Sequence, residues 1–78
     1  MIALKDIRKD DETISAKYYP EGKTQGGFLC VRLRDGEVIE HIPDGEYYKD
    51  YPPIHARKRL MFLATLDVVP KESKTYWY

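Results

Sequence analysis

Only one stretch of this sequence has the periodicity of an α-helix, and prolines bound it on both sides. It runs from about residue 53 to residue 66. Asp50 can cap its start, and Pro52 and Pro53 fit the first turn, where backbone N–H groups have no helical partner. Pro70 prevents the helix from continuing. One apolar stripe is formed by Ala56, Leu60, Leu63 and Ala64, with Ile54 and Met61 at its edge.

The second half of this helix is apolar nearly all round, because Phe62 and Leu66 lie opposite the stripe. We therefore expect the second half to be more deeply buried than the first. A chain of 78 residues allows one domain with a single core, so we expect residues 1–78 to fold as one unit around this helix.

Turn residues divide the rest of the chain about every ten positions, which is the rhythm of short strands. Residues 13–19 alternate, with Ile14, Ala16 and Tyr18 on one face. Further strands are expected at residues 2–7, 28–34, 37–42 and 75–78. Four strands, a helix and a last strand predict a two-layer α+β domain, with an antiparallel sheet of about five strands and the helix packed on one face.

Asp35-Gly36 is the strongest hairpin signal in the chain, because a two-residue type I′ turn needs residues that tolerate positive φ. A three-residue loop is the alternative, and it sets Leu29, Val31 and Leu33 beside a more polar strand. Because register follows the cleaner apolar face, we favour the two-residue loop. The facing pairs are then Leu33–Val38, Val31–Glu40, Leu29–Ile42, Arg34–Glu37, Arg32–Ile39 and Cys30–His41.

The residues that could carry chemistry are few. Cys30, His41 and His55 are the soft ligands, whereas a structural zinc site needs four ligands in paired spacings. A Cys30–His41 pair has no orienting third group and no oxyanion site. Gly26-Gly27 lacks the following helix and lysine of a phosphate-binding loop. We expect no catalytic residue, no metal and no cofactor, and therefore no enzyme.

The compartment follows from the single cysteine and the absence of long apolar runs. One cysteine excludes an internal disulfide, which suits a reducing environment. No apolar run approaches the roughly 20 residues of a membrane span, and charge interrupts the first residues too early for a signal peptide. We expect a cytoplasmic protein with no membrane partner, of the size and plain composition of small bacterial or phage proteins.

The net charge of zero conceals a segregation. Seven basic and five acidic residues give +2 over residues 1–34, one basic and six acidic residues give −5 over 35–50, and five basic and two acidic residues give +3 over 51–78. We expect the acidic segment to neutralise the basic helix start. The alternatives are an external anion at the helix start, and an acidic segment that imitates phosphates.

Tyrosine and tryptophan are the residues most above expectation, with seven Tyr and one Trp in the chain. Such rings are enriched at interfaces, although core filling is the alternative. Because one helix cannot cover both faces of the sheet, we expect a non-enzymatic interaction module. It would self-associate, or bind another protein, through the open sheet face or the C-terminal edge strand. The residues expected at the contact are Tyr19, Phe28, Ile39, Tyr76, Trp77 and Tyr78.

The alternative function is binding of RNA or single-stranded DNA, because aromatic side chains on a sheet can stack bases while cations meet phosphates. The neutral overall charge argues against it, since nucleic-acid binders usually carry a positive excess. The cations expected to contact an anion or a nucleic acid are Lys17, Arg32, Arg34, Arg57, Lys58 and Arg59.

Overall fold

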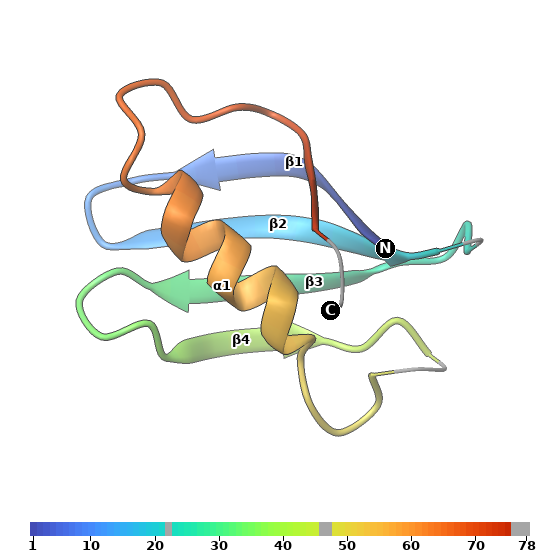
Figure 1. Ribbon diagram of the computed structural model, residues 1–78. Coiled ribbons are helices and arrows are strands. Elements are labelled where there is room, and N and C mark those ends of the chain that lie inside the picture. Colours follow the sequence, from blue (N-terminus) through green and yellow to red (C-terminus); the bar gives the residue numbers. More distant parts are fainter. Residues whose placement is uncertain (22, 46–47, 76–78) are drawn as a thin grey trace.

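The computed structural model describes residues 1–21, 23–45 and 48–75. Within them, five antiparallel strands form one sheet and a helix packs on it, which confirms the predicted α+β fold (Figure 1). The strand order is β4-β3-β2-β1-β5, so the last strand returns past the helix to pair with the first. The elements are β1 (Ile2–Lys9), β2 (Thr13–Pro20), β3 (Gly27–Arg32), β4 (Val38–Ile42), α1 (Ile54–Leu63) and β5 (Ser73–Thr75).

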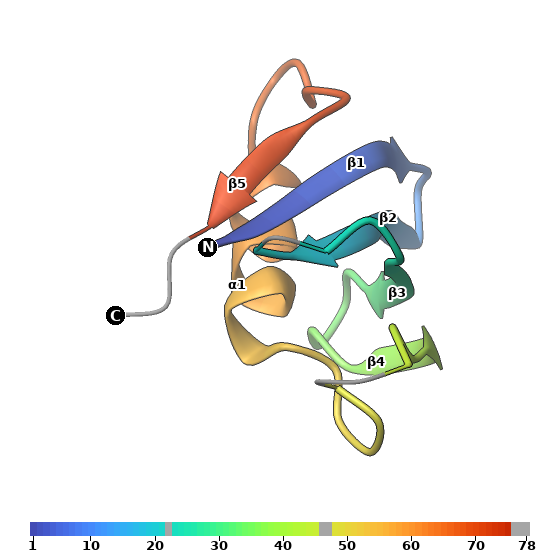
Figure 2. The same ribbon diagram turned by 90° about the vertical axis from the view of Figure 1, so that its right-hand side faces the viewer.

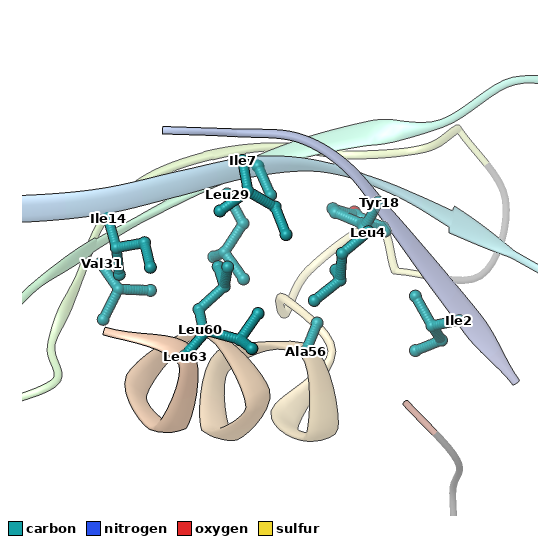
Figure 3. Packing of buried hydrophobic residues seen from close by; sticks show 11 residues of the cluster. Ile2, Leu4, Ile7, Ile14, Tyr18, Leu29, Val31, Ala56, Leu60 and Leu63 are labelled. Atoms are coloured by element: carbon teal, nitrogen blue, oxygen red, sulfur yellow. The ribbon is translucent and has the colours of Figure 1, made fainter. Parts of the chain in front are cut away.

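One face of the sheet is buried beneath α1, and the described residues place no helix or strand on the other face (Figure 2). The alternation predicted for β2 is confirmed, because Ile14, Ala16 and Tyr18 are all buried. Burying an aliphatic side chain fully contributes roughly 1.5–3 kcal/mol. The core between the two layers (Figure 3) consists of Ile2, Leu4, Ile7, Ile14, Ala16, Tyr18, Leu29, Val31, Ala56, Leu60 and Leu63.

The alternation of buried and exposed side chains along β1 is interrupted in the middle of the strand. Leu4 and Ile7 are both buried although they are three residues apart, because the register with β2 shifts between Lys5 and Arg8. Asp6 lies in this irregularity with a φ of +53°, a conformation that Asp adopts more readily than most residues. The extra residue returns Ile7 to the helix side of the sheet.

The helix is shorter and less capped than the sequence predicts. It begins after Pro53, which occupies the N-cap position without a side-chain hydrogen bond, so the predicted cap by Asp50 is wrong. It ends at Leu63 rather than near residue 66. Two of its three buried residues, Leu60 and Leu63, lie in the second half, as predicted, but that half is not buried all round, because Phe62 is 52% exposed. The sheet covers only one side of the helix, so residues opposite the stripe face solvent.

The turn between β3 and β4 has four residues, 33–36, rather than two. It is closed by hydrogen bonds from the Arg32 N–H to the Glu37 carbonyl (2.8 Å) and from the Gly36 N–H to the Arg32 carbonyl (2.8 Å). Gly36 has a positive φ of +73°, but Asp35 does not, so a type I′ turn is not formed. Asp35 instead accepts hydrogen bonds from the Glu37 N–H (3.1 Å) and the Arg32 guanidinium (2.8 and 3.1 Å).

This loop changes the register, and all six facing pairs predicted from the two-residue turn are wrong. Arg32 pairs with Glu37 and not with Ile39, and neither Leu33 nor Arg34 takes the partner predicted for it. Ile39 lies at a bulge in β4. The observed pairs are Phe28–Ile42, Leu29–His41, Cys30–Glu40 and Val31–Val38. Cys30 and His41 therefore lie on opposite faces of the sheet, and the pair considered for catalysis does not exist.

Strand β5 begins at Ser73, two residues before the predicted start, and pairs with β1 at the edge of the sheet. Its register sets Ile2 opposite Thr75 and Ala3 opposite Lys74. Tyr76, Trp77 and Tyr78, which were expected to form this strand and to join the partner contact, lie outside the described residues.

Candidate binding surface

Two adjacent tyrosines and two adjacent glycines fit together across β2 and β3. Tyr18 pairs with Gly27, and a Cβ on that glycine would lie 2.4 Å from Cζ of the Tyr18 ring. Tyr19 lies on the opposite face, and a Cβ on Gly26 would lie 2.7 Å from its Cδ1 and Cε1. The Gly-Gly pair thus leaves room for one ring on each face of the sheet.

On the helix side, Tyr18 is held by its neighbours. Its hydroxyl is 2.7 Å from Nε2 of His41, the two rings are stacked with centroids 5.7 Å apart, and Tyr48 meets the Tyr18 ring edge-on. The N–H of Tyr48 donates to the carboxylate of Asp44, which is itself buried. These contacts attach the segment after β4 to the sheet.

Burial sets the protonation of this cluster. It raises the pKa of Tyr18 to about 12, and the charge of Asp44 acts in the same direction. Burial also lowers the pKa of His41 below 6.5, against a smaller opposing effect of Asp44. Nε2 of a neutral imidazole can then accept a hydrogen bond from the Tyr18 hydroxyl. Because the Tyr18 side chain is fully buried, this contact stabilises the fold and offers no reactive group to a substrate.

The open face has cations on one half. Lys5 pairs directly with Lys17, and Ala3 pairs with both Tyr19 and Lys74, so these side chains share the face away from α1. We call the set of Lys5, Lys17, Tyr19 and Lys74 the cationic half. Nζ of Lys5 lies 5.5 Å from the centroid of the Tyr19 ring, within the range of a cation–π contact.

The three lysines of the cationic half form no ion pair with any described residue. The neighbouring arginines differ from them, because Arg8 pairs with Asp6 at 3.2 Å and Arg32 is bound by Asp35 and Glu37. The Arg32 guanidinium holds the pKa of the Asp35 carboxyl at about 2. The net positive charge of the open face is therefore concentrated on the lysines.

Two shallow depressions border the cationic half. One, of about 470 Å³, is lined by Lys5, Tyr19 and Lys23 together with Glu21, whose carboxylate is 3.4 Å from the N-terminal ammonium group. The other, of about 210 Å³, is lined by Lys5, Lys74 and Glu72 among others. Both are open to solvent.

On the β3–β4 side, the open face carries apolar side chains at the edge of the sheet together with Cys30 and Glu40, which pair with each other. Phe28 is half-buried and pairs with Ile42, which is 54% exposed, and the bulged residue Ile39 is 49% exposed. We call Phe28, Ile39 and Ile42 the apolar margin. Tyr19 and Phe28 lie on the open face as expected, on different halves of it.

The cations expected to act together are not brought together. Lys17 and Arg32 lie on the sheet, and Arg34 is exposed in the loop that precedes β4. Lys58 is exposed on α1, in the other layer of the fold. Its neighbours on α1 make internal contacts: Arg57 donates to the Gly36 carbonyl (3.0 Å), and Arg59 donates to Oγ of Ser73 (3.0 Å) and lies 5.2 Å from the Phe62 ring.

The acidic segment also behaves differently from the expectation. Asp35 and Glu37 pair with Arg32 on β3, and among the described residues no ion pair joins the acidic segment to the helix start. Lys5, Ile42 and Lys74, which were not among the residues expected at a contact, belong to the two halves of the open face. The alternation of Ile2 and Leu4 is the signal that could have placed Lys5 there.

The described residues contain no group of three or more His, Cys, Asp or Glu side chains placed to hold a metal ion. Their helix is too short to cross a membrane. Comparisons with protein-family models, with curated proteins and with solved structures found no match to this chain.

Proposed function

We propose that this protein is a non-enzymatic interaction module that self-associates through the apolar margin. The observation that supports this proposal is the exposure of Ile42, which is 54% exposed beside Phe28 at the edge of the sheet. Hiding such apolar surface contributes about 25 cal/mol for each Å² removed from water. Contiguous apolar patches on the surface of a small protein often mark interaction sites.

The arrangement of charge favours a second copy of the chain as the partner. Lys5 and Lys74 of the cationic half lie on β1 and β5, away from the apolar margin on β3 and β4. Lys17 lies between them on β2, where it pairs with Phe28. A two-fold contact centred on Ile39 and Ile42, at the β4 edge, would keep Lys5 and Lys74 of each copy away from those of the other. Self-association through the whole open face would instead oppose like charges.

The contact is expected to use side chains rather than backbone pairing. Strand β4 lies at the edge of the sheet, but Ile39 forms a bulge in it. Bulges are one way in which proteins prevent an edge strand from adding a further strand.

Sedimentation velocity across the micromolar range tests the proposal. The wild-type protein should form a dimer, and Ile42→Lys should shift it to monomer because each copy then buries a charge. Val68→Lys is the matched control, since Val68 is 82% exposed and follows α1 in the chain, far from the margin in sequence. Circular dichroism should show both variants folded. A wild-type monomer at all concentrations, or equal effects of the two variants, would overturn the proposal.

A further inference from the structure

We propose that the cationic half binds single-stranded nucleic acid, with its lysines at phosphates and Tyr19 stacked on a base. This inference goes beyond the proposed self-association and uses different residues. It rests on three observations: a like-charge pair, an aromatic ring in a fixed position, and the absence of an ion pair between these lysines and any described acid, since Asp6 and Glu21 pair with other cations.

The like-charge pair is Lys5 and Lys17, which are direct register partners on β1 and β2. Cβ atoms of such partners lie about 4.5–5.5 Å apart, and like charges placed there destabilise a sheet. Neither lysine forms an ion pair with a described residue, and Lys74 adds a third charge from β5. A polyanion bound to this face would attract each lysine and offset the repulsion between them.

The ring is Tyr19. It lies against Gly26, where any Cβ would approach its carbons to 2.7 Å, and Lys5 lies 5.5 Å from its centroid. The ring is therefore positioned before any ligand arrives, and it remains partly exposed. Stacking of bases on a fixed ring, with cations along the backbone path, is how sheet surfaces bind single strands.

The acids near these groups do not neutralise them. Glu21 is paired with the N-terminal ammonium group, and Glu40 lies on β4, two strands away from Lys17. Glu72 borders the depression that Lys5 and Lys74 line. A duplex would present phosphates, sugars and base edges to this surface but no base face, because its bases are stacked on each other, so the exposed ring favours a single strand.

Fluorescence anisotropy with labelled oligo(dT) and oligo(rU) tests the proposal at low and at physiological salt. Both probes should bind, and a preference between them would identify DNA or RNA as the natural ligand. For single strands, log K falls with log salt with a slope of about −0.7 for each phosphate neutralised, so three lysines predict a slope of about −2. Lys17→Gln should reduce the slope by about 0.7.

Variants distinguish binding through the cationic half from non-specific attraction to any exposed lysine. Lys5→Gln/Lys17→Gln should weaken binding about tenfold at low salt. Lys58→Gln, an exposed lysine on α1, is the matched control and should bind like the wild type. Tyr19→Leu should weaken binding while Tyr19→Phe retains it, because stacking needs the ring and not the hydroxyl. Glu72→Gln should strengthen binding, since it removes an acid beside Lys74.

Four outcomes would overturn the inference: no binding of either oligonucleotide at low salt, equal losses for the Lys58 and Lys17 variants, tighter binding of duplex than of single strands, or binding of anionic phosphatidylserine vesicles without binding of oligonucleotides. Binding by the Ile42→Lys variant separates the two proposals. A monomer that binds the probes supports this inference, and a wild-type dimer that does not bind them overturns it and leaves the proposed self-association intact.

Discussion

Tyr18 and Gly27 are register partners on β2 and β3, and the tyrosine ring occupies the space that a Cβ on the glycine would need. The hydroxyl of the same ring reaches His41 on β4. The Tyr18 side chain therefore links three strands, and this arrangement requires a residue without a Cβ at position 27.

Gly27→Ala should destabilise the protein, because the new methyl group would lie 2.4 Å from Cζ of Tyr18 and 2.5 Å from the carbonyl oxygen of Ile42. Overpacking of a core costs about 1–3 kcal/mol, and the backbone contact sets this site at the upper end. Urea denaturation measures the loss. Tyr18→Leu provides the matched background: if the cost of Gly27→Ala is the same there, the ring is not the obstacle.

Tyr18→Phe should cost about 1 kcal/mol of unfolding free energy, because it removes the hydrogen bond to His41 and keeps the buried ring. A double-mutant cycle with His41→Phe checks the partner. The effect of Tyr18→Phe should shrink when His41 is already replaced, and a full effect in that background would show that the hydroxyl acts elsewhere.

The stability should fall as the pH drops below about 6.5, because burial lowers the pKa of His41 in the folded protein. The unfolded chain then takes up the proton more readily than the folded protein. Stability from the neutral imidazole is therefore complete above pH 6.5 and is lost between that pH and the lowered pKa. Urea midpoints measured across this range should show the loss, and His41→Gln should abolish it. His55→Gln should leave it in place.

Asp35 also makes the protein less stable as the pH falls, but at lower pH than His41 does. Arg32 and the Glu37 N–H hold its pKa at about 2 in the folded protein, below the ordinary 3.8. The stability that depends on this carboxylate is present above pH 3.8 and is lost as the pH falls through 2. Acid titration of Asp35→Asn should lack this step while keeping the His41 step, and a curve identical to the wild type would contradict the assignment.

Gly36→Ala should cost about 1–2 kcal/mol, because the residue has a φ of +73° that a side chain with a Cβ adopts poorly. Gly36→Asn should cost less, since Asn enters this region more readily. The flexible end of Arg57, 3.1 Å from the position of the new Cβ, can move aside. Thermal denaturation of the two variants measures the difference, and equal losses would assign the cost to crowding and not to the backbone.

The parts of the fold that local patterns determine could be predicted. The alternation of Ile14, Ala16 and Tyr18 gives both the strand and its buried face, and the prolines around residues 52–70 locate the helix. The β3–β4 register was missed because Asp35 serves as a hydrogen-bond acceptor for Arg32 rather than as a residue of positive φ. The pattern of apolar residues does not indicate which of these two roles Asp35 takes.

The candidate surface depends on contacts that are distant in sequence, and it was predicted only in part. Tyr19 and Phe28 follow from alternation, whereas Lys74 reaches the open face only because β5 pairs with β1. The strand register sets Lys5 beside Lys17 and Phe28 beside Ile42. An error of one residue in the predicted register therefore moves the side chains of β4 to the wrong face of the sheet.

The strand order separates the sheet into parts that differ in how they form. Strands β1 to β4 are joined by successive sequence-local connections, whereas β5 returns from the far end of the described chain to set Thr75 beside Ile2. Among the described residues, β5 pairs with β1 through Ser73–Thr75, and contacts between segments that are distant in sequence are slow to form. We expect β5 to be the last strand to join during folding and the first to open in the native state. Amide hydrogen exchange should be fastest at this edge, so the protein opens locally next to Ile2 and Leu4 long before it unfolds as a whole.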